Sequence, residues 1–254
     1  MRVALCALVL FAGCVGSEEN TDNYELAKVR AIAGELPVVG VDSDREGGIW
    51  VAYRLTLSRD FDADAEVRVV HLAADGTKLA EFRYVDDYQR VSGLAFSGSV
   101  LFLNYNNTGA SDHNRIRMLD PSTGAHLGWL PTEAGIVDVS YRKGALLMSN
   151  LWRALIAFDP VTGHELWRAP LTFLDEKNSE ARGIAAVAGR TWVASLTDAH
   201  LYLDDDSGTL LGSAQLPYGE DDWDIDVGEQ LAWDGSALIL HRRNQITWFA
   251  VHEK

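Results

Sequence analysis

A hairpin pattern that recurs along the chain is the sequence feature that most constrains its fold. Each copy has an apolar strand, an acidic turn that ends in glycine, and a second strand; the copies are residues 67–84, 116–131, 155–171 and 201–217. Their glycines are Gly76, Gly124, Gly163 and Gly208, 39 to 48 residues apart, and a leucine follows each glycine by three positions. A turn such as Asp-Pro-x-Thr-Gly suits a tight reversal, because proline presets φ and glycine permits a positive φ. The spacing predicts a chain of repeated β units.

A second recurring segment lies ahead of each hairpin. Residues 93–103 match residues 230–240 position by position, and residues 183–193 and 135–140 are further copies. The segments begin at residues 40, 93, 135, 183 and 230, a spacing of 42 to 53 residues. Four short strands within such a spacing are typical of a β-propeller blade. We therefore predict an all-β fold, a β-propeller of five four-stranded blades, with six blades as the alternative.

The last repeat is one strand short where the chain ends at Lys254, and residues 25–32 form an additional strand ahead of the first repeat. We expect this strand to pair with residues 245–251. The pairing would complete the last blade, close the ring and remove an exposed sheet edge. Four aromatic residues within strands are expected in the core between blades: Trp50, Tyr53, Trp192 and Trp248.

Composition excludes several classes of function. The 254 residues include 22 Lys and Arg against 37 Asp and Glu, a net charge of −15. Phosphate contacts need clustered basic residues, so no nucleic-acid partner is expected. The two cysteines are Cys6 and Cys14, so residues 15–254 contain no disulfide, thiolate metal site or cysteine nucleophile.

The first 14 residues have the anatomy of an export signal. Arg2 is followed by eleven apolar residues, 3–13, too few to span a bilayer as a helix. The segment ends in LFAGC (residues 10–14), which resembles the lipobox of bacterial lipoproteins, with Phe11 where the family usually has leucine. The resemblance implies cleavage before Cys14 and a lipid on its sulfur.

The same resemblance implies a location. Val15 occupies the position at which an inner-membrane lipoprotein usually has aspartate, which implies the outer membrane. We expect a signal peptide at residues 1–13, a lipidated cysteine and tether at residues 14–24, and the propeller domain at residues 25–254. The lipid would be the membrane contact of an exported, envelope-anchored monomer.

One hairpin also resembles a known blade motif. Residues 154–168 read ALIAFDPVTGHELWR, which is similar to the repeat of PQQ-type propellers, and Trp167 matches the tryptophan of that repeat. The resemblance implies a blade. It does not imply the PQQ cofactor, because quinoprotein dehydrogenases of this type have eight blades and this chain lacks the length for them.

Two families of propeller enzymes offer a comparison. Plant-type glutaminyl cyclotransferases resemble the chain in size and in strand–turn rhythm, including Gly128-Trp129-Leu130. Their catalytic glutamate lies near the start of an inner strand, where this chain has Gly183, and this difference counts against the activity. Propeller lactonases hold one divalent ion in the channel through Glu, Asn and Asp, and no single motif here matches theirs.

The candidate binding residues come from one face of the predicted propeller. Loops ahead of the innermost strands and loops between second and third strands share that face, where ligands usually bind. Their aromatic, amide and charged side chains suit a sugar or a peptide. The candidates are Asp87, Arg90, Asn104, Asn150, Trp152, Arg153, Arg182, Trp223, His241 and Arg242. Trp152 and Trp223 are expected to flank the ligand; the alternative is that each covers the end of its own blade.

Acidic residues ahead of the inner strands form a candidate calcium site. Asp87, Glu133, Glu180 and Glu229 would converge on the channel mouth, and Ca²⁺ prefers carboxylate and carbonyl oxygen. The alternative is four solvated carboxylates in an acidic chain. Residues 60–66 match only the start of a calcium loop, and a solvated hairpin is favoured there. No other cofactor is expected.

Two classes of function remain. We favour an outer-membrane-anchored lipoprotein whose propeller is a non-catalytic binding or scaffold module for a protein, a peptide or a glycan. The alternative is a propeller enzyme, either a cation-dependent hydrolase of the lactonase kind or a cyclotransferase.

Overall fold

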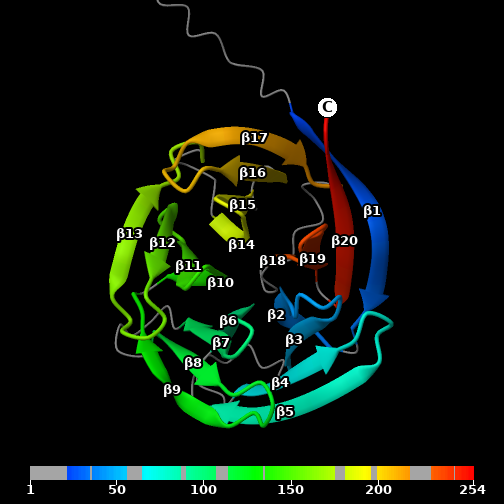
Figure 1. Cartoon of the computed structure of the whole chain (residues 1–254), viewed down its shortest axis with the longest axis vertical. Helices are drawn as coiled ribbons and strands as arrows, with labels where there is room; N and C mark the ends of the chain where they lie inside the picture. Colours follow the sequence, from blue (N-terminus) through cyan, green and yellow to red (C-terminus); the bar gives the residue numbers. More distant parts are fainter. Residues whose placement is uncertain are drawn as a thin grey trace, which may run out of the picture.

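A computed structural model describes residues 22–34, 36–55, 65–86, 90–106, 114–133, 135–174, 181–195, 199–217, 230–242 and 244–254. These residues form strands and turns, without a helix, in five antiparallel sheets of four strands each. The sheets are arranged as blades around a central axis (Figure 1). The predicted five-bladed propeller is confirmed, and the six-bladed alternative is wrong.

The blades follow one another along the chain. Blade 1 contains β2 (Val38–Ser43), β3 (Ile49–Arg54), β4 (Ala65–Leu72) and β5 (Lys78–Asp86). Blade 2 contains β6 (Arg90–Phe96), β7 (Leu101–Asn106), β8 (Arg115–Leu119) and β9 (His126–Pro131). Blade 3 contains β10 (Ile136–Arg142), β11 (Ala145–Asn150), β12 (Ala154–Phe158) and β13 (Glu165–Pro170). Blade 4 contains β14 (Ala181–Val187), β15 (Arg190–Ser195), β16 (His200–Asp204) and β17 (Leu210–Gln215). Blade 5 contains β18 (Gln230–Trp233), β19 (Leu238–Arg242), β20 (Gln245–Glu253) and, from the other end of the sequence, β1 (Tyr24–Ala33).

The first described strand closes the ring. β1 is the outermost strand of blade 5 and pairs antiparallel with β20, from Tyr24 opposite Glu253 to Ala33 opposite Gln245. Both ends of the described chain therefore meet in one sheet (Figure 1). The predicted pairing of residues 25–32 with the last strand is confirmed.

The five inner strands, β2, β6, β10, β14 and β18, share one register. Gly40, Gly93, Asp138, Gly183 and Gln230 each pair with the second strand at the equivalent place. The predicted start of the third repeat, at residue 135, is therefore wrong by three residues. Gly135 has a φ of 76° and lies in the turn ahead of β10, so it matched the other glycines in residue type but not in position.

The glycines of the inner strands are required by close packing between blades. A Cβ at Gly40 would lie 2.7 Å from the Cβ of Leu94 in blade 2, and a Cβ at Gly93 would lie 3.0 Å from Oδ1 of Asp138 in blade 3. The first distance is shorter than real Cβ contacts and the second is tighter than most of them, so a side chain at either glycine would push the neighbouring inner strand away.

The hairpin glycines have a similar role at the rim. In blades 2, 3 and 4, the glycine of the hairpin between the third and the fourth strand packs against the outermost strand of the preceding blade. A Cβ at Gly124 would overlap the ring of Phe82, and a Cβ at Gly208 would overlap the carbonyl oxygen of Pro170. The Tyr84 hydroxyl also donates to the Gly124 carbonyl oxygen at 2.8 Å. These acidic turns that end in glycine therefore serve contacts between blades as well as the reversal itself.

The leucines that follow these glycines are exposed bulge residues. In blade 1, Leu72 pairs with Lys78 and His71 pairs with Ala80, which leaves Leu79 without a partner across the strand pair. The other outermost strands have the same irregularity at Leu127, Leu166, Leu211 and, in β1, Val29. These five side chains are 41–61% exposed. A β-bulge thus lies in every outermost strand at an equivalent place.

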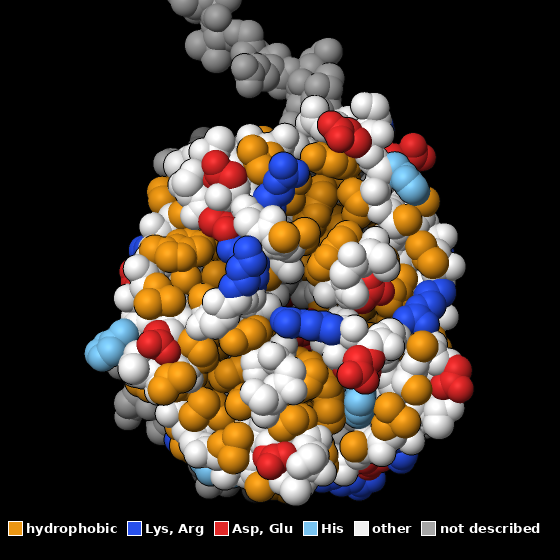
Figure 2. Space-filling view, viewed as in Figure 1, with side chains coloured by type: hydrophobic (Ala, Val, Ile, Leu, Met, Phe, Trp, Pro, Cys, Tyr) orange, Lys and Arg blue, Asp and Glu red, His pale blue; other side chains and the backbone are white. Residues whose placement is uncertain are grey.

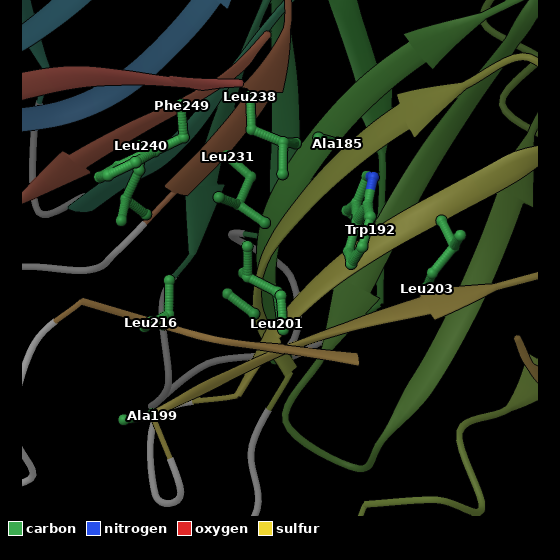
Figure 3. Close-up of a cluster of buried hydrophobic side chains, with 12 residues drawn as sticks. Ala185, Trp192, Ala199, Leu201, Leu203, Leu216, Leu231, Leu238, Leu240 and Phe249 are labelled. Carbon is green, nitrogen blue, oxygen red and sulfur yellow. The ribbon is translucent and has the colours of Figure 1, made fainter. Parts of the chain in front are cut away.

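The core lies between neighbouring blades. Hydrophobic side chains are visible between the blades on the face shown in Figure 2. Between blades 4 and 5, Trp192, Leu201, Leu231 and Phe249 are at most 4% exposed and face one another (Figure 3). The four aromatic residues predicted for the core, Trp50, Tyr53, Trp192 and Trp248, are 2–4% exposed. No helix among the described residues is long and apolar enough to cross a membrane.

Candidate functional site

The centre of the ring is crossed by side chains. Asp138, at the ring position of the inner glycines, accepts hydrogen bonds from the N–H groups of Val139 at 2.8 Å and of Ile184 in blade 4 at 2.9 Å. The N–H of Leu231 in blade 5 also bonds to this carboxyl. The side-chain amide of Gln230 donates to the carbonyl oxygen of Ser92, which links blade 5 to blade 2. Blades that are not neighbours are therefore tied together across the axis.

A second aspartate lies further along the channel. Asp42 accepts from the N–H of Phe96 at 2.6 Å and of Ser43 at 2.8 Å, which joins blades 1 and 2. Burial raises the pKa of Asp42 to about 7, although the backbone N–H groups and Arg45 act in the opposite direction. Burial raises the pKa of Asp138 well above its usual range, and the nearby Asp42 carboxyl adds to the rise.

Some of the buried polar atoms without a hydrogen-bond partner belong to strands near one end of the ring, which we call the mouth; others, such as Trp50 Nε1 and Trp248 Nε1, lie in the core between blades. The mouth is the end that faces the connections between blades and the connections between second and third strands. Side chains there have buried atoms without a hydrogen-bond partner: Asn104 Oδ1, Ser149 Oγ, Ser195 Oγ, Gln230 Oε1 and both ring nitrogens of His241. All five side chains are at most 2% exposed. Burial lowers the pKa of His241 to about 3, so its imidazole is neutral at physiological pH.

An exposed tryptophan stands on blade 3 at the same end of the ring. Trp152 is 63% exposed, and its ring lies against the backbone of Gly135, where a Cβ would be 3.0 Å from the ring. Beside it, Glu133 accepts from the Asn150 side chain at 2.8 Å and from Arg168 at 2.7 Å. The result is an aromatic plane next to a polar cluster, a combination that suits a ligand with both polar and apolar faces.

A basic side chain lies at the opposite end of the channel. Arg45, which has a φ of 64°, donates from Nη2 to the carbonyl oxygens of Phe96 at 3.5 Å and of Tyr141 at 3.2 Å. The guanidinium therefore reaches from blade 1 to blades 2 and 3. Basic side chains also gather near the middle of the face shown in Figure 2.

Some of the predicted binding residues lie at the mouth. Others lie in turns or at strand ends, or outside the described residues. Asn104, Asn150 and His241 are buried there. Trp152 and Arg153 lie in the turn between β11 and β12, where Nη1 of Arg153 donates to the carbonyl oxygen of Leu174 at 3.1 Å. Arg182 lies at a bulge near the start of β14, and Arg242 ends β19; both are half-buried. Asp87, Trp223 and the Arg90 side chain lie outside the described residues, as does Cys14.

The predicted calcium site stays a prediction. Glu180, Glu229 and Asp87 lie outside the described residues, and Glu133 is bonded to Arg168 and Asn150. Within the described part of the chain, no group of three or more His, Cys, Asp or Glu side chains is placed to hold a metal ion.

Sequence reasoning missed the residues that cross the channel. Asp42, Asp138 and Gln230 belong to the inner strands themselves, whereas the candidates were sought in loops. The available signal was a carboxyl that interrupts an apolar strand, as in VVGVDS and IVDVS. A charged group in a fully buried strand needs partners, so it marks a position at which the chain makes specific polar contacts.

The fold is a five-bladed propeller with buried polar side chains near one end. Among solved structures, the chain is similar to the glutaminyl cyclase of Myxococcus xanthus, with a TM-score of 0.66 and 10% sequence identity. The match covers 92% of this chain and 99% of that one. A weaker likeness, with a TM-score of 0.48 and 14% identity, is to a chain of a mitotic checkpoint complex, covering 94% of this chain and 68% of that one. No protein-family model matches the sequence, and no curated protein matches it significantly.

Proposed function

We propose that this chain is a non-catalytic binding module and that it holds a polar ligand, a glycan or a peptide, at the mouth. The observation that carries the proposal is the group of buried polar atoms without partners. Such atoms cost stability when nothing satisfies them, so native proteins pair nearly all of them with protein, water or ligand. Five such side chains at one end of one channel support a site that a ligand completes.

The chemistry of these atoms favours a ligand with several hydroxyl or amide groups. Asn104 Oδ1 and Gln230 Oε1 accept hydrogen bonds, whereas the serine hydroxyls and the neutral His241 ring can both donate and accept. Trp152 adds an exposed ring on which a sugar or a side chain can stack.

His241→Leu tests this proposal. Leucine has a similar volume and no polar atom, so the variant should raise the free energy of unfolding by about 1–3 kcal/mol. It should also abolish binding of chitobiose, as a glycan probe, and of Gly-Gly-Gln, as a peptide probe, measured by calorimetry. In the matched control, His71→Leu, stability should fall, because His71 bonds to Asp44 at 2.8 Å and stacks on Trp50. A His241→Leu variant that loses stability would contradict the proposal, because the imidazole would then have partners in the free protein.

Cyclotransferase activity is the second candidate. The full-length likeness to a glutaminyl cyclase favours it. So does Asp138, which in blade 3 holds the ring position that Gly183 holds in blade 4. The reaction would cyclise an N-terminal glutamine and release ammonia. Ammonia release from Gln-Gly-Gly that disappears in Asp138→Asn would replace the non-catalytic proposal; no release from the unmodified chain would leave the binding proposal standing.

A further inference from the structure

The inner strands turn one edge toward the axis of the ring, and backbone N–H groups lie along that edge. In an antiparallel pair, alternate residues direct their N–H groups away from the partner strand. Val139, Ile184 and Leu231 do so, because their N–H groups bond to the Asp138 carboxyl. They belong to blades 3, 4 and 5, and each follows the ring position of Asp138 by one residue. Three blades therefore direct a hydrogen-bond donor toward the same carboxyl.

The side chain at this ring position faces a backbone nitrogen of the next blade at three successive junctions. A Cβ at Gly40 would lie 3.0 Å from the nitrogen of Leu94, and a Cβ at Gly93 would lie 3.1 Å from the nitrogen of Val139. At the third junction, the Asp138 carboxyl makes this contact as a hydrogen bond to the next blade. Backbone nitrogens thus surround the axis, and a carboxyl stands at one place where the neighbouring blades have glycine.

The Asp138 carboxyl fills the space between its three donors. Oδ1 accepts from Val139 at 2.8 Å and Oδ2 accepts from Ile184 at 2.9 Å, so both oxygens are used. Asp138 is 1% exposed, and a buried N–H group that loses its acceptor costs stability. Several backbone N–H groups directed at one point form a nest of the kind that binds anions. Here the bound group belongs to the chain itself.

Glycine at residue 138 would leave room for a small molecule. Gly93 and Gly183 hold this ring position in blades 2 and 4, so an inner strand accommodates glycine there. Without the Asp138 side chain, the N–H groups of blades 3, 4 and 5 would line a buried space. Water can enter such a space, but it supplies one oxygen, whereas a carboxyl group supplies two.

We propose that the axis of the ring is a binding site for a small carboxyl group, which Asp138 fills from within the chain. The two oxygens of a ligand take the places of Oδ1 and Oδ2 and accept hydrogen bonds from blades 3, 4 and 5. The intact chain keeps the site closed, so an external carboxyl group competes with Asp138. The site lies among the inner strands and needs nothing from the function proposed for the mouth.

Formate and Asp138→Gly test this proposal. Formate is a carboxyl group with no other heavy atom. It should raise the folding equilibrium constant of Asp138→Gly about ten-fold at roughly ten times its dissociation constant, measured by unfolding in urea. The unmodified chain is the control for general effects of the salt, because its site is filled. Its folding equilibrium constant should change by less than about two-fold at the same formate concentration.

NMR of the backbone amides tests the location. In Asp138→Gly, formate should shift the signals of Ile184 and Leu231, which lie in different blades. The signal of Thr77, in an exposed hairpin, should not move. Formamide tests the chemistry, since it has one carbonyl oxygen in place of two carboxyl oxygens, and it should stabilise Asp138→Gly less than formate does.

Three results would overturn the proposal: equal stabilisation of Asp138→Gly and the unmodified chain by formate, equal stabilisation of Asp138→Gly by formate and formamide, or unchanged signals of Ile184 and Leu231. If Asp138→Gly does not fold with or without formate, Asp138→Ser replaces it in every comparison. A serine hydroxyl can accept from an inner strand, as Ser140 Oγ accepts from the N–H of Ala186 at 3.1 Å. Asp138→Ser therefore keeps one acceptor and still leaves room for formate.

Discussion

Two buried aspartates join neighbouring inner strands through backbone amides. Asp42 reaches Phe96 of the next blade, and Asp138 reaches Ile184. Each places a carboxyl in an otherwise apolar strand, so the carboxyl is removed from water and favours the protonated form. The consequence is a proton held more tightly in the folded chain than in the unfolded one.

This proton makes stability depend on pH. Because burial raises the folded pKa of Asp42 from 3.8 to about 7, its contribution is complete below pH 3.8 and is lost as the pH rises through 7. The slope approaches about 1.4 kcal/mol per pH unit within that window. Asp42→Asn should remove this component, measured as the difference in free energy of unfolding by urea between the two chains from pH 4 to 8.

The control for this measurement is Asp75→Asn. Asp75 is exposed in a hairpin, where hydrogen bonds from Thr77 lower its pKa, so its contribution to stability has the opposite pH dependence. Identical pH profiles for Asp42→Asn and the unmodified chain would show that Asp42 is ionised in the folded protein.

At the scale of the strand and the hairpin, the sequence predicted structure best where a residue type has one conformational role, as glycine has in a tight turn. Glycine in an acidic turn, repeated at a regular spacing, predicted the hairpins, and strand counting predicted the role of residues 25–32. The exposure of Leu79 and its equivalents could not be predicted. Side chains alternate between the two faces of a strand only when every residue pairs in register with the neighbouring strand. A bulge breaks that alternation, and it is visible only in the pairing register.

Two hairpin glycines separate the contribution of the turn from that of the contact between blades. Gly124 and Gly76 both have a positive φ, 72° and 85°, so alanine strains both backbones. Only at Gly124 does the new Cβ overlap a neighbour, Phe82. Gly124→Ala should therefore lower the free energy of unfolding by about 1–3 kcal/mol more than Gly76→Ala, measured in urea. Equal losses would mean that the rim contact adds nothing.

At the scale of the whole molecule, the number of blades and their closure could be predicted from the sequence. The hydrogen bonds that cross the axis could not. Asp138 bonds to a blade that is not its neighbour, and such a contact depends on the diameter of the closed ring. Matching residue types along the chain placed Gly135 where Asp138 stands.

Removal of β1 tests the closure. A chain that begins at Gly34 leaves the edge of β20 without its partner, and exposed edges pair with other chains. We expect this chain to form oligomers or aggregates in size-exclusion chromatography with light scattering, whereas a chain that begins at Asp22 should be monomeric. A monomeric short chain with an unchanged melting temperature would contradict the assigned role of β1.

Attachment to the membrane is tested at Cys14. If the amino-terminal segment is a lipoprotein signal, Cys14→Ser should accumulate unprocessed precursor and incorporate no labelled palmitate in a bacterial host, because the thioether needs the sulfur. Cys6→Ser is the matched control and should be processed and labelled normally. Label in Cys14→Ser at the level of the unmodified chain would exclude a lipid on this residue.

The hydrogen bonds across the axis also affect how the molecule unfolds. In most repeat proteins each unit contacts only the units beside it, so stability is a sum over neighbours and one end can unravel alone. Here Gln230 joins blade 5 to blade 2, and Asp138 joins blade 3 to blades 4 and 5. The first and last strands share one sheet besides. The loss of blade 1, 2, 3 or 5 therefore breaks a hydrogen bond in a blade that is not its neighbour. We expect unfolding to be cooperative over the whole ring.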